Sequence, residues 1–207
     1  MSFQMNKTVY LVTDDSKLDF ETLYQKLASA LQGGVGLLQL REKTASSKTF
    51  YEHALAVKPL CQEYQVPLII NDRLDIALAV DADGVHLGQN DLPLSVARKI
   101  LGPDKIIGIS ARTTEDALKA EKEGADYLGV GAVFPTSTKE DAQRISEEVF
   151  AAIQSAVTIP IVAIGGITLE NAATIVNRGV SGIAVVSAIL NQRDAKAAAQ
   201  TLKNLFA

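Results

Sequence analysis

The sequence contains no tryptophan and only one cysteine, Cys61, in 207 residues. A single cysteine excludes an intramolecular disulfide and any metal site built from several cysteines, and it is typical of the reducing cytoplasm. We interpret Cys61 as a small apolar side chain on a helix and not as a nucleophile. We therefore expect a cytoplasmic protein without disulfide bonds.

The sequence also lacks an excess of basic residues and any long apolar run. It carries 20 Lys and Arg against 24 Asp and Glu, with no basic block that could neutralise a nucleic-acid backbone. The longest apolar runs, at 66–70 and 183–186, are far shorter than the roughly 20 residues that span a bilayer. Residues 1–7 lack the features of a secretory signal. These absences predict no nucleic-acid partner and no membrane partner.

Short β-branched segments alternate along the whole chain with segments of helical spacing, which predicts a parallel sheet covered by helices. The expected strands are residues 8–13, 35–41, 67–71, 83–87, 106–110, 126–131, 160–164 and 182–186. The expected helices include residues 20–32, 50–64, 114–123, 147–155, 169–177 and 195–206. Thr113 to Asp116 has the pattern of a capping box, and Thr168 is the expected N-cap of the helix at Leu169.

The number of units indicates how the sheet closes. Eight strands in 207 residues leave about 26 residues for each strand and helix, near the lower limit for a TIM barrel. A doubly wound sheet uses the same elements, but eight units with no visible linker favour the closed barrel. We therefore predict an α/β fold, a single-domain (β/α)8 TIM barrel over residues 1–207.

In such a barrel the active site lies at the carboxyl ends of the strands. A period of two along the second strand places Gln39, Arg41 and Lys43 on one face, opposite Leu38 and Leu40. Two cations in the barrel mouth are costly unless an anion binds between them. The alternative is a solvated strand end, which fits Lys43 better than Arg41.

Acidic residues follow the third and fourth strands. Asn71 and Asp72 come directly after the third strand, and Asp91 lies shortly after the fourth. Neighbouring strands are about 4.8 Å apart, so these carboxylates can converge on one Mg²⁺ ion. Each residue alone could instead be a helix N-cap. A Mg²⁺ ion beside the basic residues of the second strand is typical of a diphosphate site.

Loops after the last three strands predict a second phosphate site. Residues 131–139 are rich in hydroxyl groups and end in Lys139, and Gly165 and Gly166 follow the seventh strand. The loops after strands 7 and 8 are the usual phosphate site of a TIM barrel. We interpret His86 as a structural residue and leave it unassigned. Asp14 is either a site residue or a turn former.

Nine segments in this order resemble the thiamine-phosphate synthases along nearly the whole chain. They are residues 10–14 (YLVTD), 39–43 (QLREK), 71–73 (NDR), 84–89 (GVHLGQ), 107–110 (IGIS), 126–131 (DYLGVG), 134–139 (FPTSTK), 163–167 (AIGGI) and 184–189 (AVVSAI). The resemblance implies a transferase that joins hydroxymethylpyrimidine diphosphate to a thiazole phosphate and releases pyrophosphate. The sequence departs from the family's usual pattern at Ala132, where proline is frequent, and at Asn90, where an acid is frequent.

The resemblance also implies roles for individual residues. The implied Mg²⁺ ligands are Asp72 and Asp91, and the groups implied to act in catalysis are Arg41, Lys43, Ser110 and Lys139. The implied contacts of the pyrimidine diphosphate are Gln39, Leu40, Arg41, Glu42, Lys43, Asn71, Ser110 and Lys139. The implied contacts of the thiazole phosphate are Thr136, Ser137, Thr138, Gly166, Val186 and Ser187.

Two other functions fit parts of the same pattern. A thiazole tautomerase shares the barrel and several of these segments, but it has no diphosphate that would require the cations and the acid pair. A sensor that binds a phosphate ligand without converting it has no use for a metal beside a leaving group. The expected partners are the two small-molecule substrates, and the sequence leaves open whether the chain forms a homo-oligomer.

Overall fold

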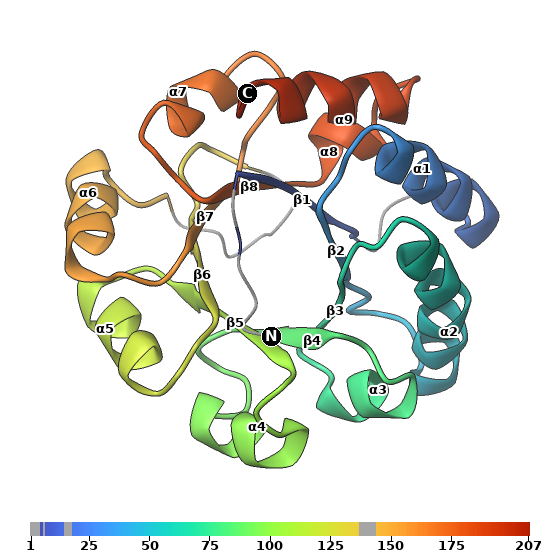
Figure 1. Cartoon of the computed structure of the whole chain (residues 1–207), viewed down its shortest axis with the longest axis horizontal. Helices are drawn as coiled ribbons and strands as arrows, with labels where there is room; N and C mark the ends of the chain where they lie inside the picture. Colours follow the sequence, from blue (N-terminus) through green and yellow to red (C-terminus); the bar gives the residue numbers. More distant parts are fainter. Residues whose placement is uncertain (1–4, 6, 15–17, 137–143) are drawn as a thin grey trace.

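The computed structural model describes residues 5, 7–14, 18–136 and 144–207. Eight parallel strands pair in sequence order, and β8 pairs with β1 to close the barrel. The helices surround this ring of strands (Figure 1). The predicted (β/α)8 barrel is therefore confirmed, and the doubly wound sheet is excluded. The strands are β1 Thr8–Val12, β2 Leu37–Leu40, β3 Leu68–Asn71, β4 Gly84–Leu87, β5 Ile106–Ala111, β6 Tyr127–Gly131, β7 Ile161–Ile164 and β8 Gly182–Val185.

The helices follow the predicted pattern with two differences at their amino ends. The helix α2 begins at Ser47, earlier than expected, because the Ser46 side chain caps it by accepting the Thr49 N–H. The helix α7 begins only at Ala172, since the Thr168 N–H bonds the Asn171 side chain in a turn. The helices are α1 Phe20–Gln32, α2 Ser47–Glu63, α3 Leu74–Ala79, α4 Leu94–Leu101, α5 Thr114–Lys122, α6 Glu147–Ala156, α7 Ala172–Val176, α8 Ser187–Leu190 and α9 Ala195–Asn204.

The barrel has two buried layers, one inside the ring of strands and one between the strands and the helices. Leu37 belongs to the inner cluster with Tyr10 and Tyr127, whereas Leu38 and Leu40 belong to the outer cluster. Gln39 follows the inner alternation and is buried beside Tyr10. The predicted period of two along β2 is therefore confirmed, and it directs alternate side chains toward the barrel axis.

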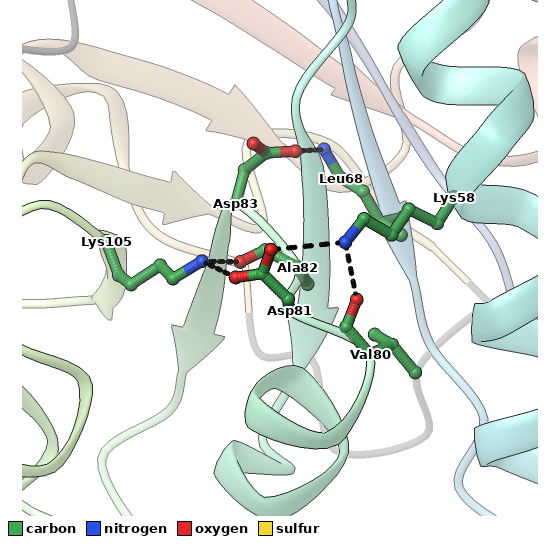
Figure 2. Close-up of polar contacts among 7 residues, drawn as sticks. All are labelled: Lys58, Leu68, Val80, Asp81, Ala82, Asp83 and Lys105. Carbon is green, nitrogen blue, oxygen red and sulfur yellow. Dashed lines mark hydrogen bonds and ion pairs between the residues drawn. The ribbon is translucent and has the colours of Figure 1, made fainter.

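Charged residues join the amino ends of the strands, at the opposite end of the barrel from the carboxyl ends. Lys58 of α2 and Lys105 before β5 both reach Asp81, which lies in the connection from α3 to β4 (Figure 2). The two ammonium groups also donate to the carbonyl oxygens of Val80 and Ala82, each at 2.8 Å. Residues at this end of a TIM barrel serve stability rather than catalysis.

Cys61 lies fully buried on α2. Burial raises the pKa of its thiol to about 12, and the nearby charge of Asp83 acts in the same direction. A thiol with this pKa stays protonated at neutral pH, so Cys61 packs as an apolar side chain. Among the described residues, none of the helices combines the length and the apolar character needed to cross a membrane.

Candidate active site

A cavity of about 290 Å³ lies at the carboxyl ends of the strands. Its lining comes from β1 and β2 on one side and from β5 to β8 on the other. Six residues that the sequence places in a site line this cavity, namely Arg41, Ser110, Thr136, Gly166, Val186 and Ser187. The cavity therefore brings together residues as distant in the chain as Val12 and Ser187, as barrel closure requires.

The end of β2 is held by a hydroxyl group of the neighbouring strand. Thr13 is completely buried, and its Oγ1 accepts the Arg41 N–H at 2.8 Å and donates to the Arg41 carbonyl oxygen at 3.1 Å. Gln39 lies deeper, where its Nε2 donates to the Tyr10 hydroxyl at 2.5 Å. Leu40 packs in the outer layer, so only its backbone can face a ligand.

Glu42 is turned toward the helices. Its Oε1 lies 2.6 Å from His53 Nδ1 of α2, and its side chain is only 9% exposed. The His53 ring stacks on Phe20 of α1 with a centroid distance of 3.7 Å. The second carboxylate oxygen of Glu42 is buried, with no hydrogen-bond partner among the described residues. Glu42 thus anchors the β2 end to the helical layer.

The acids after β3 and β4 lie together. Lys43 forms an ion pair with Asp72, and Asp91 Oδ2 accepts the Gly88 N–H at 2.7 Å. Burial raises the pKa of Asp91, and the Asp72 carboxyl group beside it raises the pKa further. The structure thus brings together the two predicted carboxylates with the predicted lysine.

Neither acid caps a helix. The N-cap residues of α3 and α4 are Arg73 and Pro93, and no side chain caps either helix. The N-cap interpretation of Asn71, Asp72 and Asp91 is therefore wrong. Asn71 lies buried at the end of β3, paired in register with His86 of β4. Within the described part of the chain, no three His, Cys, Asp or Glu side chains gather in one place.

Ser110 is connected to β2 by hydrogen bonds that cross the barrel. His86 bonds the Ser110 hydroxyl through Nε2 at 2.9 Å and the Tyr127 hydroxyl through Nδ1 at 3.0 Å. Tyr127 in turn bonds the Tyr10 hydroxyl at 2.8 Å, which accepts from Gln39. Burial raises the pKa of both tyrosines, so their hydroxyl groups remain protonated. His86 has partners for both ring nitrogens, as expected of a structural histidine.

The glycines after β7 pack directly on the loop after β6. Gly166 has a φ of +67°, and a Cβ atom there would lie 2.3 Å from the Pro135 carbonyl oxygen. Its own carbonyl oxygen accepts the Asn171 Nδ2 group at 2.9 Å. Only glycine combines this backbone conformation with this close approach.

Val186 and Ser187 lie at the start of α8, where first-turn N–H groups lack intrahelical acceptors. Ser137, Thr138 and Lys139 lie outside the described residues.

Comparisons with known proteins identify the family. Residues 9–189 match the family model described as thiamine monophosphate synthase. The chain belongs to the thiamine-phosphate synthase family. It is 54% identical to the thiamine-phosphate synthase of Ruminiclostridium cellulolyticum over 100% of this chain and 98% of that protein. It is 50% identical to the synthase of Methanobrevibacter smithii over 98% of this chain and 96% of that protein.

A solved structure gives the same result. The thiamine phosphate pyrophosphorylase from Pyrococcus furiosus superposes with a TM-score of 0.88 and 43% identity, covering 98% of this chain and 96% of that one. This member of the thiamine-phosphate synthase family is therefore an enzyme, a transferase of thiamine biosynthesis. The tautomerase and sensor interpretations are not favoured.

The sequence did not reveal the groups that support this candidate site. Thr13, His53 and Tyr127 act through contacts with residues that are distant in the chain. Only strand pairing and helix docking create those contacts. One signal was available, since polar hydroxyl residues at strand positions that face a barrel interior require hydrogen-bond partners.

Proposed function

We propose that the enzyme condenses 4-amino-5-hydroxymethyl-2-methylpyrimidine diphosphate with a thiazole phosphate, or its carboxylated form, to give thiamine phosphate and pyrophosphate. One observation carries this proposal. Arg41 lines a cavity whose other side is formed by the glycine loop after β7 and the start of α8, and the Lys43–Asp72 ion pair and Asp91 follow the neighbouring strands β2, β3 and β4. Two different phosphate-bearing substrates fit such a divided site.

The diphosphate half contains positive charge where a leaving group needs it. Arg41 and Lys43 extend from the end of β2, and Ser110 adds a hydroxyl group from β5. We assign the diphosphate oxygens to these groups and to Lys139. Gln39 and Asn71 are assigned to the pyrimidine diphosphate as well, together with the backbone of Leu40 and the segment that Glu42 anchors.

Asp72 and Asp91 fit a Mg²⁺ ion. The Asp72 carboxyl group is close enough to disfavour the charge of Asp91, and a divalent cation would reverse this effect. Mg²⁺ is usually held by one or two carboxylates together with substrate phosphates, so two acids are sufficient. When bound, the ion would neutralise charge on the diphosphate.

The thiazole phosphate half needs few charges. Gly166 lets an anion approach the backbone, and Val186 and Ser187 present the N–H groups at the start of α8. The Ser187 hydroxyl adds a donor, and we assign Thr136, Ser137 and Thr138 to the same phosphate. Apolar residues such as Ile164 and Ile167 line the same cavity and suit a flat ring.

In the proposed reaction one C–O bond breaks and one C–N bond forms. The methylene C–O bond breaks, and pyrophosphate leaves with both electrons. Arg41, Lys43 and Lys139 stabilise this developing negative charge more than they stabilise the intact diphosphate, and such a difference accelerates a reaction. The aminopyrimidine bears the cation, and the thiazole nitrogen lone pair forms the new C–N bond. No protein nucleophile is required.

Turnover of the purified enzyme tests the function. Pyrophosphate and thiamine phosphate are measured with each substrate alone and with both, and we expect products only with both. Lys139→Ala should lower turnover roughly ten- to a hundredfold, because a charge-assisted contact contributes about 1.5–3 kcal/mol. Lys122→Ala, on the exposed face of α5, is the matched control. Thiazole isomerisation without pyrophosphate release would contradict the proposal.

The remaining expectations concern partners and location. We propose the two small-molecule substrates as the partners of the site and the cytoplasm as its location, in accord with a lone buried cysteine. Size-exclusion chromatography with light scattering measures whether the chain forms a homo-oligomer.

A further inference from the structure

One acidic residue in the cavity has no role in the function proposed above. Asp14 follows β1, and it is the only acid among the described residues that line the cavity. Its Oδ1 atom is buried and finds no hydrogen-bond partner among the described residues. The lining also includes the cationic side chains of Arg41 and Arg112.

A buried carboxylate oxygen without a donor is costly. Buried polar atoms of this kind require an explanation, and a bound ligand that supplies positive charge or a donor is one. The Oδ1 atom itself is covered, but the Asp14 residue lines the cavity, so a positively charged ligand bound there lies beside the carboxylate and interacts with its charge.

The place of Asp14 in the barrel indicates which part of the ligand it meets. The strand β1 pairs with β2 on one side and with β8 on the other. The proposed diphosphate contacts extend from β2, and the proposed thiazole phosphate contacts from β8. The end of β1 therefore lies between the two proposed subsites, where the two rings have to meet.

We propose that Asp14 is a catalytic residue that stabilises the positive charge of the joined rings, an inference that rests on the proposed function. Departure of pyrophosphate with the electron pair of the C–O bond leaves a cation on the pyrimidine methylene group. The thiazole nitrogen then donates its lone pair to that carbon, so the charge moves onto the thiazole ring. A carboxylate beside the new bond stabilises the pyrimidine methylene cation and the thiazolium ring more than it stabilises the neutral thiazole.

The test compares two ligands of the same shape, one with a positively charged thiazolium ring and one whose ring is uncharged. Thiamine phosphate and its analogue with carbon in place of the thiazole nitrogen carry the same phosphate, so the phosphate contacts cancel in the ratio of their affinities. We expect wild-type enzyme to bind thiamine phosphate more tightly than the analogue. Asp14→Asn should weaken thiamine phosphate by roughly ten- to a hundredfold and leave the analogue within about twofold.

Two further variants complete the experiment. Asp14→Glu keeps the charge and should restore part of the preference, whereas Asp104→Asn removes an equal charge from an exposed loop and should change neither affinity. Calorimetry measures the affinities, and turnover is followed in parallel. Equal affinities of wild type for the two ligands, or an unchanged ratio in Asp14→Asn, overturns the inference alone. Failure of wild type to make thiamine phosphate overturns the proposed function, and the inference with it.

Discussion

The Thr13 hydroxyl extends the pairing of β1 and β2 beyond its last backbone bond. The Thr13 N–H donates to the Gln39 carbonyl oxygen at 2.9 Å, and the side chain then pairs with both backbone groups of Arg41. A single buried residue therefore fixes the backbone of Arg41, which we propose to bind the diphosphate. Side-chain hydroxyl groups compete well for such positions because one oxygen can both donate and accept.

Thr13→Val keeps the shape of the side chain and removes its hydroxyl group. We expect a loss of about 1–3 kcal/mol in the free energy of unfolding, because the Arg41 N–H is left without its acceptor. The loosened Arg41 should also raise the KM for the pyrimidine diphosphate more than the KM for the thiazole phosphate. Denaturant unfolding and initial rates measure the two effects. Thr13→Ser restores the hydroxyl group, and if it behaves like Thr13→Val, the hydrogen bonds are not the cause.

At the scale of elements, the amino ends of the strands are held by charge rather than by packing alone. Asp81 receives Lys58 from α2 and Lys105 from the segment before β5, so one carboxylate joins a helix to two strand connections (Figure 2). The Lys105 and Lys58 ammonium groups lower the pKa of Asp81 in the folded protein. A lowered pKa means that folding favours the ionised carboxylate.

This contribution has a defined dependence on pH. It is fully present above the pKa of Asp81 in the unfolded chain, about 3.9, and is lost as the pH falls toward the lower folded pKa. We therefore expect Asp81→Asn to lower Tm at pH 5–7, with a difference from wild type that shrinks below about pH 4. Thermal unfolding between pH 2 and pH 7 measures this, with Asp104→Asn as the exposed control. A difference that is constant across this range would contradict the role of the ion pairs.

At the scale of the whole molecule, the short β-branched segments predicted strand positions to within about two residues, because a strand that faces two apolar layers is apolar along its length. Barrel closure then determined which strand ends meet, and so Arg41, Ser110 and Ser187 could be expected around one cavity. The contacts of Tyr10 with Tyr127 and of Glu42 with His53 could not be predicted. They depend on register across the barrel and on helix docking, which a local sequence pattern does not contain.

The same closure separates the two halves of the proposed site, and the separation can be measured. Asp91→Ala should weaken the binding of inorganic pyrophosphate with Mg²⁺ by about tenfold or more, because a ligand of the proposed ion is lost. The same substitution should change the affinity for thiazole phosphate by less than about twofold. Ser187→Ala should do the reverse, since one hydrogen bond to a charged group contributes about 1.5–3 kcal/mol.

Calorimetric titration of each ligand into both single variants and the double variant tests this division. Residues without shared partners have additive effects to within about 0.5 kcal/mol, so the double variant should lose both affinities by the factors seen separately. Circular dichroism confirms that each variant is folded. If either single substitution weakens both ligands equally, Asp91 and Ser187 belong to one shared phosphate site, and the assignment of β2 to β4 and of β7 to β8 to different substrates is wrong.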